Sequence, residues 1–239
     1  MQRSIGIMGG MGPEATADLF AKIIRATPAR RDQDHIRVVI DSDPRIPDRA
    51  AHIWGRGPDP RPHMLRAARH LVDAGADLIV IPCNTAHAFY DDIAAAVPVP
   101  VLHIMREVAA WLAVEHPDLR RVGLLATVTT IRLGLYHEAL AEMGVEVLVP
   151  HEVAQQGVTR AIYGPDGVKA GNHRAARERV LAAARDLARR GAQAVILGCT
   201  ELPLVMGPED LDVPVIDAND VLARAAVREA LRDDRRAQV

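Results

Sequence analysis

The sequence has only two cysteines and no metal-binding motif, and each shortage excludes a class of protein. Cys83 and Cys199 lie 116 positions apart in the 239 residues. This spacing fits neither a CxxC redox motif nor a paired zinc site, and two cysteines are too few for a disulfide framework. The ten histidines form no H-E-x-x-H or Cys/His pattern, so we expect no metal. The two thiols are either inert core residues or chemical reagents.

The sequence also lacks a charge excess, a long apolar run and, almost entirely, lysine. A formal net charge of -2 offers no broad basic surface, so we expect no nucleic-acid partner. No run approaches the roughly 18 apolar residues of a membrane span, and the glycine-broken N-terminus is too short for a signal peptide. We therefore expect no membrane partner and a cytoplasmic protein. Lysine occurs only at Lys22, expected on a solvated helix surface, and Lys169, in a glycine loop where it could reach an anion.

Short apolar runs alternate with helical stretches along the chain. The runs cover residues 4–8, 37–41, 77–81, 99–104, 121–126, 145–149, 194–198 and 213–217. Because they are continuously apolar, they predict parallel strands covered on both faces by helices, hence an α/β fold. Helical periodicity covers residues 15–27, 61–75, 133–144 and 174–191. The irregular stretches 43–63 and 163–172 are expected to be loops that cover a cleft.

The two halves of the chain repeat the same landmarks in the same order. GADLIVIPC (75–83) resembles GAQAVILGC (191–199), and IGIMGG (5–10) matches VGLLAT (122–127). Gly6 precedes Cys83 by 77 residues, and Gly123 precedes Cys199 by 76. We interpret this as an internal duplication of two four-stranded α/β units. Ligands bind at the carboxyl ends of parallel strands, so the duplication predicts the two cysteines on opposite walls of one cleft.

Each cysteine follows a strand and precedes small polar residues where a helix could begin. The sequences are Cys83-Asn84-Thr85 and Cys199-Thr200. A helix N-terminus attracts carboxylates and lowers the pKa of a thiol, which would suit an anionic substrate. The alternative is that both cysteines are simply packed in the core.

Other candidates each have a competing interpretation. Residues 10–15 fit G-x-G-x-x-A, but Asp41 lies farther along than the usual ribose-binding acid, so close approach to a small carboxylate is the simpler use. Arg49 competes with Arg45 and Arg56 as an anion ligand. His103 and Asp217 end equivalent strands and could tune the thiols, although His103 also fits a core position. Glu201 could bind a substrate ammonium or favour a helix N-terminus.

These motifs together resemble the aspartate/glutamate racemase family, and most closely its aspartate racemase branch. The resemblance rests on IGIMGGMGPEAT, IPDR, IPCNTAH, LLAT, GVKAGN and ILGCTELP, which occur in order over nearly the whole chain. It implies two pseudo-symmetric domains, each with a four-stranded parallel sheet, and an active site in the cleft between them. The last strand and helix would return to the first domain, giving domains of 1–104 plus 215–239 and of 105–214. It also implies a homodimer.

The resemblance further implies racemisation of aspartate, with glutamate as a further substrate, without pyridoxal phosphate or another cofactor. One cysteine thiolate would remove the α-proton and the other thiol would protonate the opposite face, with Cys83 and Cys199 as the catalytic pair. Arg49 and Lys169 fall where the family holds the side-chain carboxylate of an acidic amino acid. The remaining residues that it implies for substrate binding are Met11, Asn84, Thr85, Thr127 and Thr200.

Several alternatives stay open at this level. The same architecture could serve a racemase for another amino acid, a maleate cis-trans isomerase or a malonate decarboxylase, although the decarboxylases work with one cysteine. A non-catalytic protein that binds a dicarboxylate, and a dehydrogenase, are further alternatives.

Overall fold

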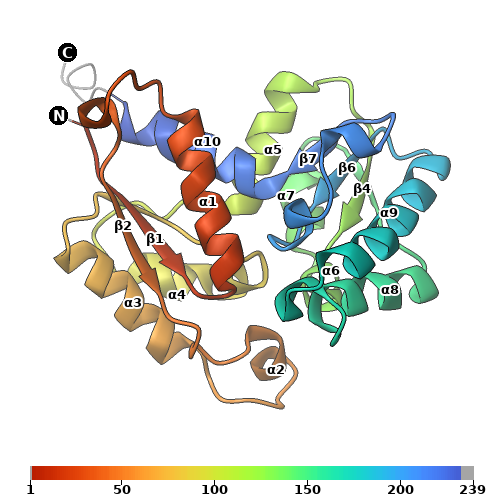
Figure 1. The fold of residues 1–239 in the computed structure, drawn as a ribbon, viewed down its shortest axis with the longest axis horizontal. Coiled ribbons are helices and arrows are strands. Elements are labelled where there is room, and N and C mark those ends of the chain that lie inside the picture. Colours follow the sequence, from red (N-terminus) through yellow and green to blue (C-terminus); the bar gives the residue numbers. More distant parts are fainter. Residues whose placement is uncertain (1, 233–239) are drawn as a thin grey trace. The chain divides into compact units, whose positions relative to one another are not determined.

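The structure is a computed structural model that describes residues 2–232 (Figure 1). The chain divides into two compact units. The first comprises Met1–Ile104 and the chain from Leu222 onward, and the second comprises Met105–Val221.

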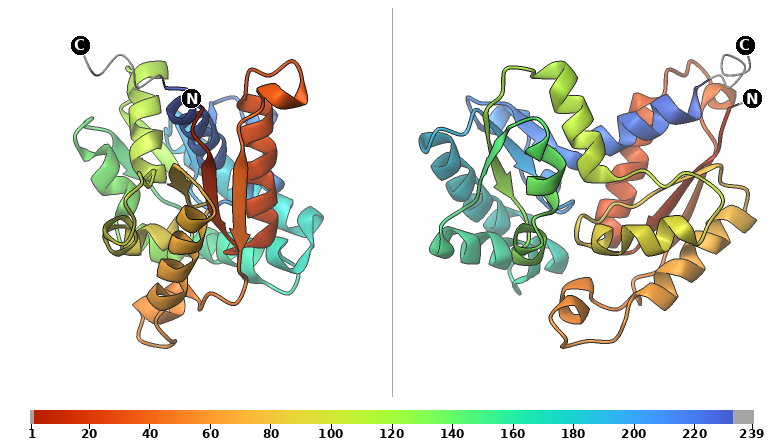
Figure 2. Two further views of the ribbon diagram at one scale, coloured as in Figure 1. Left: turned by 90° about the vertical axis from the view of Figure 1, so that its left-hand side faces the viewer. Right: turned by 180° about the vertical axis from the view of Figure 1, so that it is seen from behind.

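The first unit is built on a parallel sheet in the order β2-β1-β3. Its strands are β1 (Ile5–Gly9), β2 (Val38–Ser42) and β3 (Leu78–Val80). Its helices are α1 (Pro13–Ala26), α2 (Arg49–Ile53), α3 (Arg61–Asp73) and α4 (Tyr90–Ala95). Figure 2 shows α1 and α3 on opposite faces of the sheet, as expected when right-handed crossovers, here from β1 to β2 and from β2 back past β1 to β3, run in opposite directions along the sheet.

The expected fourth strand of the first sheet is reduced to one parallel bridge, between Ile79 and Val101. Ile79 accepts a hydrogen bond from Leu102 and donates one to Pro100, but pairing goes no further. The next backbone groups bind side chains instead: the Tyr90 hydroxyl donates to the Val101 carbonyl at 2.9 Å. The prediction of an α/β fold is thus confirmed, whereas the prediction of a fourth full strand in this sheet was wrong.

The second unit has the four expected parallel strands, in the order β5-β4-β6-β7. They are β4 (Arg121–Leu125), β5 (Glu146–Leu148), β6 (Ala194–Leu197) and β7 (Val215–Asp217). The helices are α5 (Ile104–Glu115), α6 (Val128–Arg132), α7 (Leu135–Ala141), α8 (Glu152–Tyr163) and α9 (His173–Arg189), followed by α10 (Ala218–Ala230). Helices α8 and α9 pack against each other beside the sheet (Figure 1).

The return to the first unit comes later in the chain than expected. Strand β7 pairs with β6, with Ile216 opposite Ile196, and therefore belongs to the second sheet. The chain joins the first unit only from Leu222, inside α10. Pairing satisfies the backbone groups of β7 within the second sheet, and the division at Leu222 lies farther along the chain than the expected boundary at 214/215.

The duplication is visible in the strand registers. Gly6 of β1 lies opposite Ile79 of β3, and Gly123 of β4 lies opposite Val195 of β6. Both glycines sit under a helix: a Cβ on Gly6 would lie 3.3 Å from the Cβ of Leu71, and one on Gly123 would lie 3.0 Å from that of Leu187. The same close approach of helix to strand is therefore built twice, at corresponding positions.

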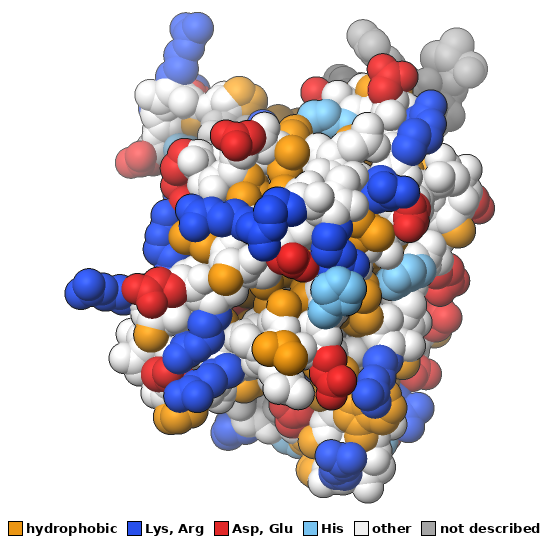
Figure 3. All heavy atoms as spheres, turned by 90° about the vertical axis from the view of Figure 1, so that its right-hand side faces the viewer, with side chains coloured by type: hydrophobic (Ala, Val, Ile, Leu, Met, Phe, Trp, Pro, Cys, Tyr) orange, Lys and Arg blue, Asp and Glu red, His pale blue; other side chains and the backbone are white. Residues whose placement is uncertain are grey.

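Lys22 is not the solvated residue that its position suggests. Only 7% of the residue is exposed, and its ammonium forms an ion pair with Asp18 one turn earlier on α1. Elsewhere charge is spread over the surface: on the face drawn in Figure 3, basic and acidic side chains are interspersed. No helix in the described part of the chain is long and apolar enough to cross a membrane.

Candidate active site

Cys83 lies in a buried turn just after β3. The residue is 7% exposed, and its N–H donates to the carbonyl of Ile81 at 2.8 Å. Asn84 and Thr85 are also buried, and a 3₁₀ helix, Thr85–Phe89, begins where a helix was expected. Cysteine, amide and hydroxyl are thus gathered at the carboxyl end of a strand, as the sequence predicted.

His87 fixes the backbone of this turn and was not predicted. Its Nδ1 lies 3.0 Å from the Cys83 carbonyl oxygen, and its Nε2 accepts a hydrogen bond from the Ile104 N–H at 3.2 Å. Since a backbone N–H can only donate, the proton of the neutral imidazole is on Nδ1. The ring also packs against His103, with centroids 4.9 Å apart. The sequence did contain a signal for this contact: His87 follows Cys83 by four residues, about one helical turn, which places the two residues on the same side of a helix.

Arg49 and Met11 meet in the first unit. The Arg49 guanidinium donates hydrogen bonds to the carbonyls of Pro47 at 3.1 Å and Met11 at 3.4 Å. Met11 itself is 3% exposed. Its competitor Arg45 has a side chain that is 84% exposed and pairs with Asp43. The structure therefore separates Arg49 from Arg45 by its half-buried setting among backbone carbonyls.

The glycine loop before α1 is held by its own contacts. Gly10 has φ of 90°, and a Cβ there would come within 2.4 Å of the Asp43 backbone. Its N–H donates to the Thr16 hydroxyl at 3.0 Å. This N–H is already satisfied, so the simple expectation of a carboxylate bound by the loop amides does not hold at Gly10; the glycine serves close packing.

Cys199 follows β6 and makes a direct hydrogen bond to a carboxylate. Its Sγ lies 3.0 Å from Oε2 of Glu201 and donates to it. Cys199, Thr200 and Glu201 are 6%, 2% and 4% exposed. Neither interpretation of Glu201 from the sequence, as a ligand of a substrate ammonium or as a helix N-terminal acid, included this contact with the thiol.

Lys169 belongs to the same cluster. Its ammonium forms an ion pair with Oε1 of Glu201, and Nζ lies 5.8 Å from the centroid of the Tyr163 ring. The backbone around it forms a short 3₁₀ helix, Val168–Ala170, within the stretch expected to be a loop. Lys169 thus already has an anionic partner in its own unit.

The surroundings of Cys199 favour the protonated thiol. Burial raises the pKa of Cys199 well above its ordinary value, and the negative charge and hydrogen bond of Glu201 raise that pKa further. The positive charge of Lys169 opposes this effect in part. We expected a helix N-terminus after the strand to lower the pKa of this thiol. The pKa of Cys199 is instead raised.

Thr127 and Asp217 hold helix starts in the second unit. The Thr127 hydroxyl oxygen accepts from the Thr130 N–H at 3.2 Å, which caps α6. The Asp217 carboxylate accepts from the Asn219 N–H at 2.8 Å at the start of α10. Both side chains are thereby engaged locally.

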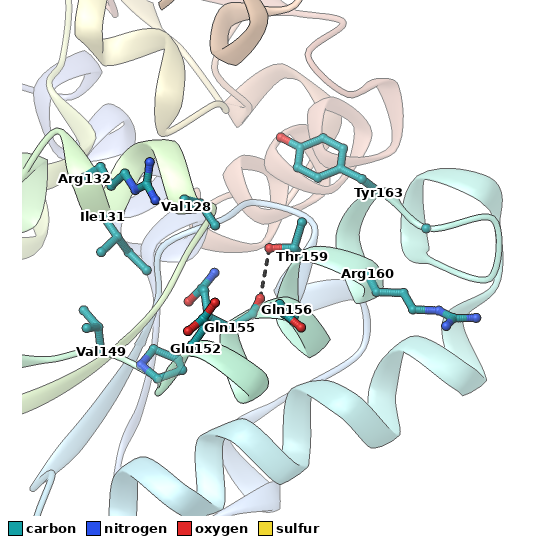
Figure 4. A pocket seen from close by; sticks show the side chains of 12 residues that line it. Val128, Ile131, Arg132, Val149, Glu152, Gln155, Gln156, Thr159, Arg160 and Tyr163 are labelled. Atoms are coloured by element: carbon teal, nitrogen blue, oxygen red, sulfur yellow. Dashed lines mark hydrogen bonds between the residues drawn. The ribbon is translucent and has the colours of Figure 1, made fainter. Parts of the chain in front are cut away.

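A pocket of about 710 Å³ lies in the second unit, between α6, α8 and the chain after β5 (Figure 4). Gln155, on its wall, donates to the Ala126 carbonyl at 2.9 Å. Tyr163 lines the pocket and also approaches Lys169. All the substrate-binding residues predicted from the sequence lie within the described part of the chain, and none of them lines this pocket.

The structure brings predicted residues together within each unit: Cys83 with Asn84 and Thr85, Met11 with Arg49, and Cys199 with Thr200. Lys169 joins Cys199 through Glu201. Within residues 2–232, no group of three or more histidine, cysteine or acidic side chains could hold a metal ion.

Comparisons with known proteins identify the family of this chain. The family model for Asp/Glu/Hydantoin racemase matches residues 8–226. The broad specificity amino-acid racemase RacX of Bacillus subtilis (strain 168) is 30% identical over 231 residues, covering 93% of this chain and 96% of that protein.

Solved structures are similar over nearly the whole chain. Picrophilus torridus aspartate racemase matches with a TM-score of 0.85 and 31% identity, covering 95% of this chain and 94% of that one. An aspartate racemase homologue from Pyrococcus horikoshii OT3 matches with a TM-score of 0.77 and 30% identity, covering 96% and 100%. The chain therefore belongs to the Asp/Glu/hydantoin racemase family and is an isomerase.

Proposed function

We propose that the protein interconverts L- and D-aspartate by a two-base mechanism with Cys83 and Cys199. The observation that carries the proposal is the equivalence of the two thiols: each is buried directly after the corresponding strand of a duplicated sheet, β3 or β6. Both are free cysteines. Racemisation needs a base on one side of the α-carbon and an acid on the other, and a duplicated cysteine supplies such a pair.

The substrate is assigned from the cations and from the relatives. Arg49 would bind the side-chain carboxylate, because its planar guanidinium suits that group. Lys169 would assist, and Asn84, Thr85, Thr127 and Thr200 would bind the α-carboxylate and stabilise the charge that builds on it. The similarity to an aspartate racemase at 31% identity supports this choice. The scheme uses no pyridoxal phosphate: the thiols would transfer both protons, and the groups that bind the α-carboxylate would stabilise the charge that builds when the α-proton leaves.

A racemase of wider substrate range is the second candidate. Lys169 is already paired with Glu201, which leaves less positive charge for a distal carboxylate, and one relative is a broad specificity amino-acid racemase. Under this alternative, neutral amino acids would be turned over at rates comparable to aspartate. The homodimer and the cytoplasmic location stay proposals drawn from the family resemblance.

The test is to incubate the purified, reduced protein with L-aspartate in deuterated buffer without pyridoxal phosphate. NMR follows loss of the α-proton, and circular dichroism follows loss of optical activity. We expect both signals to decay, with aspartate faster than glutamate, alanine or serine. Equal rates would favour the wider substrate range, and no exchange with any amino acid would contradict the racemase.

The mechanism is tested by replacing each thiol. Cys83→Ala and Cys199→Ala should each slow racemisation by about 10²–10⁴-fold, the usual contribution of a positioned acid or base. Far-ultraviolet circular dichroism and a thermal unfolding curve would verify that both variants are folded. A folded variant that keeps most of the racemase activity would contradict the two-base scheme.

A further inference from the structure

The two halves differ at the residue that lies two positions after each cysteine. In the first unit this residue is Thr85, and in the second it is Glu201. Both are buried, at 7% and 4% exposure. The duplication therefore places a neutral hydroxyl beside one thiol and a carboxylate beside the other.

Glu201 holds two partners at once. Its Oε2 accepts the Cys199 S–H at 3.0 Å, and its Oε1 pairs with the Lys169 ammonium. An ionised carboxylate can only accept hydrogen bonds, so the proton of this contact is on sulfur. The Lys169 ammonium compensates the negative charge that the buried carboxylate would carry.

Two other groups act on Cys199: the charge of Lys169 opposes that of Glu201, and Tyr136 adds no charge. Lys169, from the 3₁₀ helix Val168–Ala170, is the cation. From α7, Tyr136 interacts with Cys199 and is fully buried, and burial raises its pKa above its ordinary value, so its phenol stays neutral. Asp217, at the end of β7, acts on Tyr136. The charge that faces the thiol most directly is that of Glu201.

We propose that Glu201 is a positioning residue that keeps Cys199 in its protonated form, so that Cys199 is the acid and Cys83 the base of the resting enzyme. The assignment rests on the proposed racemase function for its catalytic meaning. This resting form binds one enantiomer of the substrate. Cys83 takes the proton from the α-carbon, and the Cys199 thiol gives its proton to the opposite face of that carbon. After one turnover the proton is on Cys83, and solvent exchange restores the resting form.

The chain allows a direct test, because it has only two cysteines. In a Cys83→Ala background Cys199 is the only thiol, and its ionisation is followed by absorbance at 240 nm and by the pH dependence of alkylation with iodoacetamide. Glu201→Gln should move the midpoint to lower pH. At a pH below both midpoints, alkylation should become about tenfold faster or more, since each unit of pKa changes the thiolate fraction tenfold.

Lys169→Met should move the same midpoint in the opposite direction, to higher pH. This opposition separates the proposal from mere loosening of the structure, which would speed alkylation in both variants. Glu201→Asp keeps the charge and should stay nearer to the parent than Glu201→Gln. The matched control uses a Cys199→Ala background, in which Glu201→Gln should leave the titration of Cys83 unchanged.

In the two-cysteine enzyme, Glu201→Gln should move the alkaline limb of the kcat/KM profile to lower pH and leave the acid limb in place. An unchanged Cys199 titration midpoint in folded Glu201→Gln would overturn the proposal. So would a shift of that midpoint in the same direction in Glu201→Gln and Lys169→Met. The thiol titration does not depend on turnover. A protein that titrates as expected but exchanges no α-proton would refute the racemase function alone.

Discussion

At the residue scale, the candidate site depends on which of several similar side chains is held in place. Among the arginines of residues 43–63, Arg49 binds backbone carbonyls in the first unit, whereas Arg45 is largely exposed. Of the two lysines, Lys169 contacts Glu201 and Lys22 contacts Asp18. Residue type alone does not distinguish these members, because the difference comes from their partners.

The role of Arg49 gives a prediction about substrate binding. Arg49→Lys keeps the charge but loses the planar fork, so the KM for aspartate should rise about tenfold or more, in line with the 1.5–3 kcal/mol that a hydrogen bond to a charged group contributes. Steady-state kinetics with both enantiomers would measure it. Arg45→Lys is the matched control and should leave KM unchanged; equal effects of the two substitutions would show that Arg49 has no special role.

At the element scale, the repeated strand-and-helix unit depends on a glycine in each half. Helices α3 and α9 each end shortly before a glycine with positive φ, Gly75 and Gly191. Each helix then packs over the glycine of a central strand, Gly6 or Gly123. The spacing of helix above sheet in both halves follows from these small residues.

This packing predicts paired effects on stability. Gly6→Ala would bring a Cβ to 2.9 Å from the Cβ of Ala76, and Gly123→Ala would bring one to 3.0 Å from that of Leu187. Each should reduce the free energy of unfolding by about 1–3 kcal/mol, the usual cost of overpacking. The control is Gly157→Ala in α8, where a Cβ meets nothing within 4 Å and should raise stability by up to about 1 kcal/mol.

Urea unfolding of the three glycine variants would measure these differences. If Gly6→Ala and Gly123→Ala matched Gly157→Ala, close packing would not be the reason for glycine at either strand.

At the scale of the whole molecule, the chain leaves the first unit at Ile104 and returns to it within α10. The return is tied at its end, because the Arg3 N–H donates to the Ala230 carbonyl at 3.0 Å and the Arg3 side chain pairs with Glu229. The first unit is thus built from both ends of the described chain.

This organisation predicts where a core mutation acts. Leu222 is fully buried in α10, so Leu222→Ala should cost about 2–5 kcal/mol. Hydrogen exchange read by mass spectrometry should show lost protection first in peptides covering β1, β2 and β3. The matched variant Leu187→Ala, in the core of the second unit, should act first on β4 and β6. Protection lost first in the second unit for Leu222→Ala would contradict the assignment of α10.

The sequence by itself determined the fold class, the duplication and the placement of both cysteines. Continuous apolar runs predict buried parallel strands because each residue of such a strand faces a helix layer. The strand ends could likewise be predicted, since Cys83 and Cys199 directly follow such runs. Helical periodicity did not predict the short helix α2 or the helices α5 and α8, and the last helix, α10, was expected only from the family resemblance.

Only the tertiary structure decided which groups form hydrogen bonds and ion pairs with the residues at the ends of these elements. Tyr90 and His87 bind the backbone where a fourth strand was expected in the first sheet, and β7 stays in the second sheet. Glu201 reaches Lys169, 32 positions away, and Cys199. A local sequence pattern reflects how a residue fits its neighbours along the chain. Hydrogen bonds and ion pairs, in contrast, join residues that are far apart in the sequence. Those partners come together only when the chain folds and closes the loops between them.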